Sequence, residues 1–152
     1  MSSDPKLPPK VFTVEEANAT LPLVRAIATD LANLARDISE RRDRLAFLMA
    51  DRDIEEGDPY GDELNQMREE LEKDEDRLRE YIVELQELGV VPNGLEEGLV
   101  DFPSMMDGRL VFLCWKLGEP EVLHWHEIDA GFTGRQPLTA GSVADDGFES
   151  TT

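Results

Sequence analysis

The chain has 152 residues, of which 40% are hydrophobic, and this length and composition predict one globular domain with a modest core. Its 34 acidic and 15 basic residues give a formal net charge of −19, which argues against nucleic acid and membrane surfaces as partners because both repel an acidic protein. No apolar run is long enough to span a bilayer, and the first ten residues lack the apolar region of a signal peptide. Together with a single cysteine, Cys114, these features predict a cytoplasmic protein with a buried, unpaired thiol.

The N-terminal part of the chain predicts a short helix. Residues 1–10 hold three prolines and no periodic apolar pattern, which predicts a disordered segment. Thr13 and Glu16 have the spacing of a capping box, so a helix should begin at residue 13. Pro22 should break this helix near Thr20, because proline has no amide proton and its ring clashes with the preceding turn. A new helix should then start with Thr20 as its cap.

Two long helices are expected from apolar residues that recur at alternating spacings of three and four, as in a heptad seam. The first seam comprises Val24, Ile27, Leu31, Leu34, Ile38, Leu45 and Leu48. The second comprises Leu64, Met67, Leu71, Leu78, Tyr81, Leu85 and Leu88, with Gly89 as a C-terminal cap. The connecting segment is short, so residues 13–89 should form an antiparallel, coiled-coil-like helical hairpin.

One polar residue interrupts each seam, Arg41 in the first and Asp74 in the second. Pairing the helices about their loop places these two residues in adjacent layers, where they either form a partly buried ion pair or lean out to solvent. The apolar stripe is wider in the half of the hairpin nearest Pro22 and Leu88, which favours packing of a sheet there. The other half should project as an acidic arm that pairs with another copy of the chain.

Residues 98–129 predict a three-stranded antiparallel meander. A short strand should start at Gly98 and end at Pro103, followed by strands over 110–117 and 122–128 that are joined by a turn. Alternation along the third strand places one set of side chains, Val122, His124, His126 and Ile128, opposite another, Leu123, Trp125 and Glu127. Residues 130–138 should close the domain, and the acidic residues 139–152 should be disordered. The expected fold class is α+β, with the sheet packed on the base of the hairpin.

The segment from His124 to Asp129 holds the main cluster of metal-type ligands. Two histidines at positions i and i+2 of a strand present both imidazoles to one side, which suits a divalent ion, and Asp129 at the strand end supplies a carboxylate. Glu127 points away from a regular strand and needs a bulge to join them. The candidate ligands are therefore His124, His126, Glu127 and Asp129, and the candidate ions are zinc, iron and manganese. The alternative is a pair of packed or half-exposed imidazoles.

The segment Gly131 to Arg135, GFTGR, predicts either an anion site or a closing turn. Glycines that flank an aromatic residue allow a tight turn whose amides, together with Arg135 and Arg109, bind an anion. In the alternative, Phe132 lies in the core and Arg135 pairs with a carboxylate. The sequence contains no phosphate-binding glycine loop and no complete catalytic constellation.

Four blocks of the sequence resemble one protein family. FTVEEANATLPLV, GLVDFP, LCWKLGEPEV and WHEIDAGFTGRQPL, spread over about residues 11–138, are similar to the bacterial family DUF2203, a domain of unknown function. The resemblance implies no activity. The family pattern falls on Trp125, His126, Glu127, Asp129, Gly131, Phe132 and Arg135. The position of His124 is more often aromatic or apolar in that family, which shifts weight to His126, Glu127 and Asp129 as ligands.

These observations favour a cytoplasmic binding or scaffold module without catalysis that acts as a homo-oligomer, with another copy or a further protein as its partner. The reason is that about half of the chain is heptad hairpin while no catalytic constellation is complete. The alternative is a divalent-metal-binding protein, including a metal-dependent hydrolase with His126 and Asp129 as ligands and Glu127 as ligand or general base. A third alternative is an anion or small-molecule site at Arg135 and Arg109.

Overall fold

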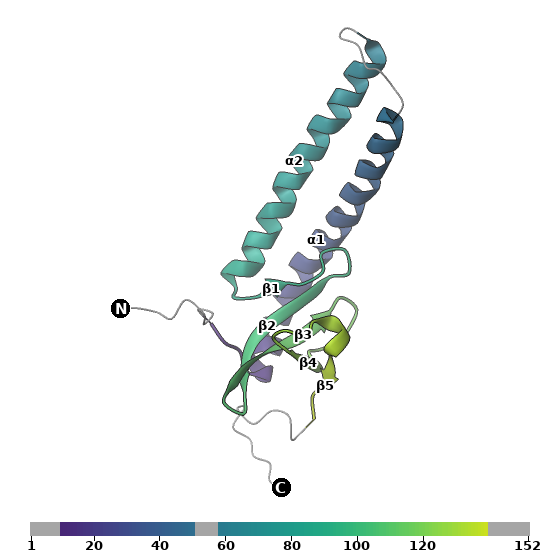
Figure 1. Cartoon of the computed structure of the whole chain (residues 1–152). Coiled ribbons are helices and arrows are strands. Elements are labelled where there is room, and N and C mark those ends of the chain that lie inside the picture. Colours follow the sequence, from purple (N-terminus) through teal and green to yellow (C-terminus); the bar gives the residue numbers. More distant parts are fainter. Residues whose placement is uncertain (1–9, 51–57, 140–152) are drawn as a thin grey trace, which may run out of the picture.

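The computed structural model describes residues 10–50 and 58–139 and shows two long helices and an antiparallel sheet (Figure 1). The expected disordered ends are residues 1–10 and 139–152, and apart from Lys10 and Thr139 they lie outside the described residues. The helices are α1 (Val14–Met49) and α2 (Pro59–Glu87). The strands are β1 (Val91–Pro92), β2 (Leu99–Met106), β3 (Arg109–Lys116), β4 (His124–Glu127) and β5 (Gln136–Pro137), with a short 3₁₀ helix, η1 (Phe132–Gly134), before β5. The expected α+β class is confirmed.

Helix α1 begins where the sequence predicts and runs further than expected. The amide of Glu16 donates to Thr13 Oγ1, and the amide of Thr13 donates to Glu16 Oε1. Each hydrogen bond is 3.0 Å long, so the capping box is confirmed. The expectation of a separate short helix that ends near Thr20 is wrong, because α1 continues through Pro22. The proline is exposed, while the neighbouring Leu21 and Val24 are buried in the core shared with the sheet. Their burial offsets the one helical hydrogen bond that proline removes.

The two helices lie antiparallel and side by side, as expected for a helical hairpin (Figure 1). Helix α2 starts after Asp58, whose Oδ1 accepts a hydrogen bond from the amide of Tyr60 at 2.9 Å, and the chain leaves it through Gly89 with a φ of +89°. Between the helices, Arg41 Nη2 lies 2.5 Å from Asp74 Oδ2, and 25% of each side chain is exposed. Of the two alternatives expected from the sequence, the partly buried ion pair is confirmed, and the alternative in which both side chains lean out to solvent is wrong.

Five strands form the sheet, and the expected number of three is wrong. Their order is β1-β2-β3-β4-β5, and every neighbouring pair is antiparallel. The two additional strands, β1 and β5, are two residues long and leave no alternating pattern in the sequence. Strands β3 and β4 form the expected hairpin, although β4 is shorter than the predicted range 122–128.

Pro103 does not end β2, which continues to Met106. The amide of Phe12 donates to the carbonyl of Pro103 at 2.7 Å, so the backbone groups of Pro103 face the Phe12 segment and not β3. Because the amide and carbonyl of one residue point to the same side of a strand, the donor that proline lacks would have pointed to the sheet edge. The expectation that proline stops the strand is wrong for this reason.

The sheet packs against the base of the helical hairpin, as expected, and leaves the rest of the hairpin as an arm (Figure 1). The larger core cluster joins both helices to the sheet, and its members include Leu21, Leu85, Phe102, Trp115 and Trp125. A smaller cluster in the arm buries Ile38, Leu45, Leu64 and Leu71. Neither helix in the described part of the chain is both long and apolar enough to cross a membrane.

Candidate functional site

The face of the sheet that is turned away from the helices holds a buried group of ionisable side chains. Phe102 and Trp115 pack toward the helices, so the alternate positions Asp101 on β2 and Cys114 on β3 face the other way. These two residues lie directly opposite each other, and His126 on β4 lies diagonally next to Cys114. The exposed fractions of Asp101, Cys114 and His126 are 2%, 0% and 1%. We call these three residues the buried cluster.

Hydrogen bonds orient the two ionisable partners in the buried cluster. His126 Nδ1 lies 2.7 Å from the backbone carbonyl of Glu127, and because a carbonyl only accepts, Nδ1 carries a proton. His126 Nε2 lies 3.0 Å from Asp101 Oδ1, so one shared proton joins the imidazole to the carboxyl group. The other oxygen of Asp101 accepts a hydrogen bond from Asn93 Nδ2 at 2.9 Å. Burial raises the pKa of the Asp101 carboxyl, and the hydrogen bond from His126 opposes that rise.

Cys114 completes the buried cluster with a thiol. Burial, and then the negative charge of Asp101, raise the pKa of this thiol to about 11. A sulfur atom, a carboxyl oxygen and a ring nitrogen from the three residues all lie within 4.8 Å of one another. The buried, unpaired cysteine expected from the sequence is confirmed, and the arrangement directs three different donor atoms toward one point.

A pocket of about 360 Å³ is lined by two members of the buried cluster, Asp101 and His126, and we call it the sheet pocket. Its lining comes from β1 and the residue after it, from β2, β3 and β4, and from residues 128–131. The polar lining residues are Asn93, Asp101, His126 and Asp129. No lysine or arginine is among the described residues that line it, so the electrostatic potential of the sheet pocket favours cations.

The structure brings two of the four predicted metal ligands to the sheet pocket. The buried His126 and the exposed Asp129 both line it. His124 faces the same side of the sheet as His126 and lies directly opposite Cys114 in the register, but its ring nitrogens are not among the donor atoms that converge in the buried cluster. Its Nδ1 is 3.8 Å from Glu119 Oε2 and has no hydrogen-bond partner among the described residues.

Glu127 and the two arginines predicted to bind an anion are held in separate ion pairs. Arg109 Nη2 lies 2.6 Å from Glu127 Oε2, and this hydrogen bond lowers the pKa of the Glu127 carboxyl. Strand β4 pairs in continuous register, without the bulge that Glu127 needs to join a metal site. Arg135 Nη2 lies 2.7 Å from Glu119 Oε1, and although burial acts to raise the pKa of Glu119, this hydrogen bond holds it below its ordinary value. The structure therefore does not bring Arg109 and Arg135 together.

Phe132 lies at the surface of the GFTGR segment. Its side chain is 38% exposed, so the expectation that it belongs to the core is wrong. The ring centroid lies 4.8 Å from the guanidinium carbon of Arg135 and 5.6 Å from Lys116 Nζ. These cation–π contacts explain why the ring stays outside the core. The alternative in which Arg135 pairs with a carboxylate is confirmed by its contact with Glu119.

Sequence reasoning missed Asp101 and Asn93. The available signal was the aspartate between Val100 and Phe102 in a mostly apolar strand, because a buried carboxyl group requires a partner. The sequence did not predict which residue is that partner, because His126 is 25 residues away and reaches Asp101 only across β3.

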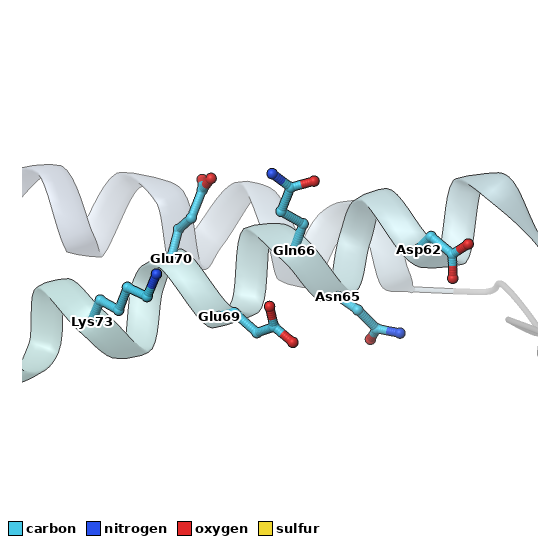
Figure 2. A pocket seen from close by; sticks show the side chains of 6 residues that line it. All are labelled: Asp62, Asn65, Gln66, Glu69, Glu70 and Lys73. Atoms are coloured by element: carbon cyan, nitrogen blue, oxygen red, sulfur yellow. The ribbon is translucent and has the colours of Figure 1, made fainter.

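A second hollow, of about 500 Å³, lies along α2 (Figure 2). It is lined by Asp62, Asn65, Gln66, Glu69, Glu70 and Lys73, all from one helix. Figure 2 shows that these side chains spread along the helix and do not converge on one point. This surface is a solvated, charged helix face and not a candidate site.

The fold and the site define an α+β protein in which a helical hairpin carries a five-stranded antiparallel sheet with a buried aspartate–cysteine–histidine cluster. The chain belongs to the family of uncharacterized conserved proteins DUF2203, whose family model matches residues 10–138, and the resemblance seen in the sequence is confirmed. No curated protein and no solved structure matches the chain. The description of the family names no activity.

Proposed function

We propose that this protein is a cytoplasmic cation-binding module that works without catalysis and uses the sheet pocket as its ligand site. One observation carries the proposal. Two carboxyl groups, those of Asp101 and Asp129, line a pocket of about 360 Å³ that has no lysine or arginine among its described lining residues. The net charge of −19 adds a long-range field that attracts cations to the protein.

The sheet pocket has the features of a site for a small ligand. Phe112 and Ile128 supply apolar surface, and Asn93 and Asp101 supply hydrogen-bonding groups. The Asp101 carboxyl already bonds to Asn93 and His126, so it is held in one orientation before a ligand arrives. Preorganised groups lose less entropy on binding, which supports a binding role for this carboxyl.

The contacts of the nucleophilic and basic groups support the absence of catalysis. Both ring nitrogens of His126 are engaged, one with a backbone carbonyl and one with Asp101, so neither is free to act as a base on a bound molecule. The pKa of Cys114 is about 11, which leaves the thiol protonated and a weak nucleophile near neutral pH. Ser104 donates its hydroxyl proton to the carbonyl of Phe12 and has no histidine partner among its described hydrogen bonds.

Thermal unfolding of the purified full chain tests the proposal. We expect 1,4-diaminobutane and divalent metal chlorides to raise Tm, and sodium acetate at the same ionic strength to leave it unchanged. Ile128→Trp, which places a large ring at the sheet pocket, should reduce the rise in Tm. Leu123→Trp is the matched control, because Leu123 is similarly exposed, 40% against 51%, and does not line the sheet pocket. A chain that no cation stabilises, or an equal shift in both variants, would contradict the proposal.

A second candidate function is a homo-oligomeric scaffold, and the thin core of the arm favours it. Two isolated helices bury few apolar residues, and the arm cluster has four buried side chains, those of Ile38, Leu45, Leu64 and Leu71. Phe47, which is 78% exposed, lies on the same part of α1. We expect a second copy to pack on the arm, so Phe47→Ser should weaken self-association in sedimentation equilibrium while Val83→Ser, at the base, should not. A monomer at high micromolar concentration would exclude this function.

A further inference from the structure

We infer that the cation bound at the sheet pocket is a divalent transition-metal ion, with zinc preferred, held by the three side chains of the buried cluster. The inference rests on the proposed function, because it names the ligand of the same site. The ligands are Asp101, Cys114 and His126. Of the four ligands expected from the sequence, this set keeps His126 and leaves Asp129 at the rim of the pocket.

The distances among the donor atoms suit one small ion. In a tetrahedral zinc site, bonds of about 2.0 Å to nitrogen or oxygen and about 2.3 Å to sulfur place the donors roughly 3.3–3.6 Å apart. In the buried cluster the separation is 3.0 Å between His126 Nε2 and Asp101 Oδ1, and no donor pair is farther apart than 4.8 Å. Side-chain movements of about 1 Å therefore close the set on one ion.

Two of the three ligands already have the supporting hydrogen bonds that metal ligands use. His126 donates Nδ1–H to the carbonyl of Glu127 at 2.7 Å, which turns Nε2 toward the buried cluster. Asn93 Nδ2 holds one oxygen of Asp101 at 2.9 Å and leaves the other facing His126. Metal-binding imidazoles and carboxylates are oriented by partners of this kind. In the metal-free protein the Cys114 thiol interacts with the Asp101 carboxyl and with the Arg135 guanidinium, so a bond to the ion would replace these interactions of the sulfur atom.

The chemistry of the donors selects the kind of ion. One thiolate sulfur, one imidazole nitrogen and one carboxylate oxygen suit zinc and related first-row ions, whereas magnesium and calcium prefer oxygen ligands alone. Binding releases two protons to solvent, one from the Cys114 thiol and one that His126 and Asp101 share. The two negative charges that remain balance the charge of the dication, so the buried site stays neutral. A water molecule or the carboxylate of Asp129 can take the fourth position from the sheet pocket.

Cobalt(II) substitution tests the inference, because a bond between cobalt and thiolate absorbs in the near ultraviolet. The full chain is stripped with a chelator, dialysed, and titrated with cobalt(II) chloride and then with zinc(II) chloride, and both absorption and heat are measured. We expect one equivalent of cobalt to bind with a thiolate band that zinc removes. Cys114→Ser should abolish the band. Asp101→Asn and His126→Gln should each weaken the zinc affinity at least about tenfold.

Two matched variants serve as controls. His124→Gln removes the other histidine, and Glu127→Gln makes the same change of charge as Asp101→Asn outside the buried cluster. Both should bind zinc like the wild type, and circular dichroism checks the fold of every variant. If a variant of His126 or Asp101 does not fold, Cys114→Ser decides the question, because it exchanges a single atom.

The outcomes separate this inference from the proposed function. Unchanged zinc binding in Cys114→Ser would show that the buried cluster is not the site and would overturn the inference. If the wild type binds neither cobalt nor zinc while 1,4-diaminobutane still raises Tm, the metal inference fails and the cation-binding proposal stands. If neither the metals nor the diamine bind, both fail.

Discussion

The thiol of Cys114 predicts how the stability of the metal-free protein should change at alkaline pH. In the folded chain, burial raises the pKa of this thiol from 9.0 to about 11. The folded state holds the thiol proton more tightly than the unfolded state does. The stabilisation of the folded state by the protonated thiol is therefore complete below pH 9.0 and is lost as the pH rises through about 11. At about 1.4 kcal/mol for each pKa unit, the loss in the free energy of unfolding amounts to about 3 kcal/mol.

Urea unfolding of the wild type and of Cys114→Ala, followed by circular dichroism between pH 8 and 11 in chelator, measures this loss. Groups that titrate in both proteins cancel in the difference, so the advantage of the wild type should shrink by about 2 kcal/mol by pH 11, where about half of the folded protein still holds the thiol proton. Cys114→Ser should give the same curve as Cys114→Ala, because neither variant carries a titrating thiol. Parallel curves for the wild type and both variants would refute the reasoning, since they would mean that solvent reaches the thiol in the folded protein.

Three further predictions concern the stability of the fold, each measured as the free energy of unfolding in urea. Thr13→Ala should lower it by about 1 kcal/mol because the capping box loses an acceptor, and an unchanged value would contradict that role. Arg41→Met should lower it by about 1–2 kcal/mol because the partly buried Asp74 loses its nearer partner and keeps only the more distant Arg77, and adding Asp74→Leu should restore most of the loss. Trp115→Ala should lower it by about 3–5 kcal/mol because a fully buried ring leaves a cavity between helices and sheet, and a loss below about 1 kcal/mol would argue against that packing.

The helices were predictable because their signals are local. The seam positions recur every three or four residues, and the capping box and Gly89 lie within one turn of the helix ends that they mark. The sequence placed Arg41 and Asp74 in adjacent layers of the two helices but left open whether they pair or lean out to solvent, and the structure shows the pair. Pro22 misled the prediction because its local penalty is smaller than the burial of its neighbours in a core that the sheet completes.

The candidate site was only partly predictable. The sequence pointed to the strand that holds His126, and the alternation of side chains correctly separated His126 from Glu127. It did not connect His126 with Asp101 or Cys114, which lie on two other strands. The pairing of Glu127 with Arg109 was equally hidden, because it depends on the register between β3 and β4.

By itself, the sequence determined the helical hairpin and the hairpin of β3 and β4, because periodic patterns and turn residues act over a few neighbouring positions. Only the tertiary structure decided which ionisable groups share the buried cluster and which ones pair at the surface. The register of three adjacent strands sets those partners, and that register follows from the packing of Phe102, Leu113 and Trp125 against the helices. Such packing joins residues that are far apart in the chain, so no local pattern records it.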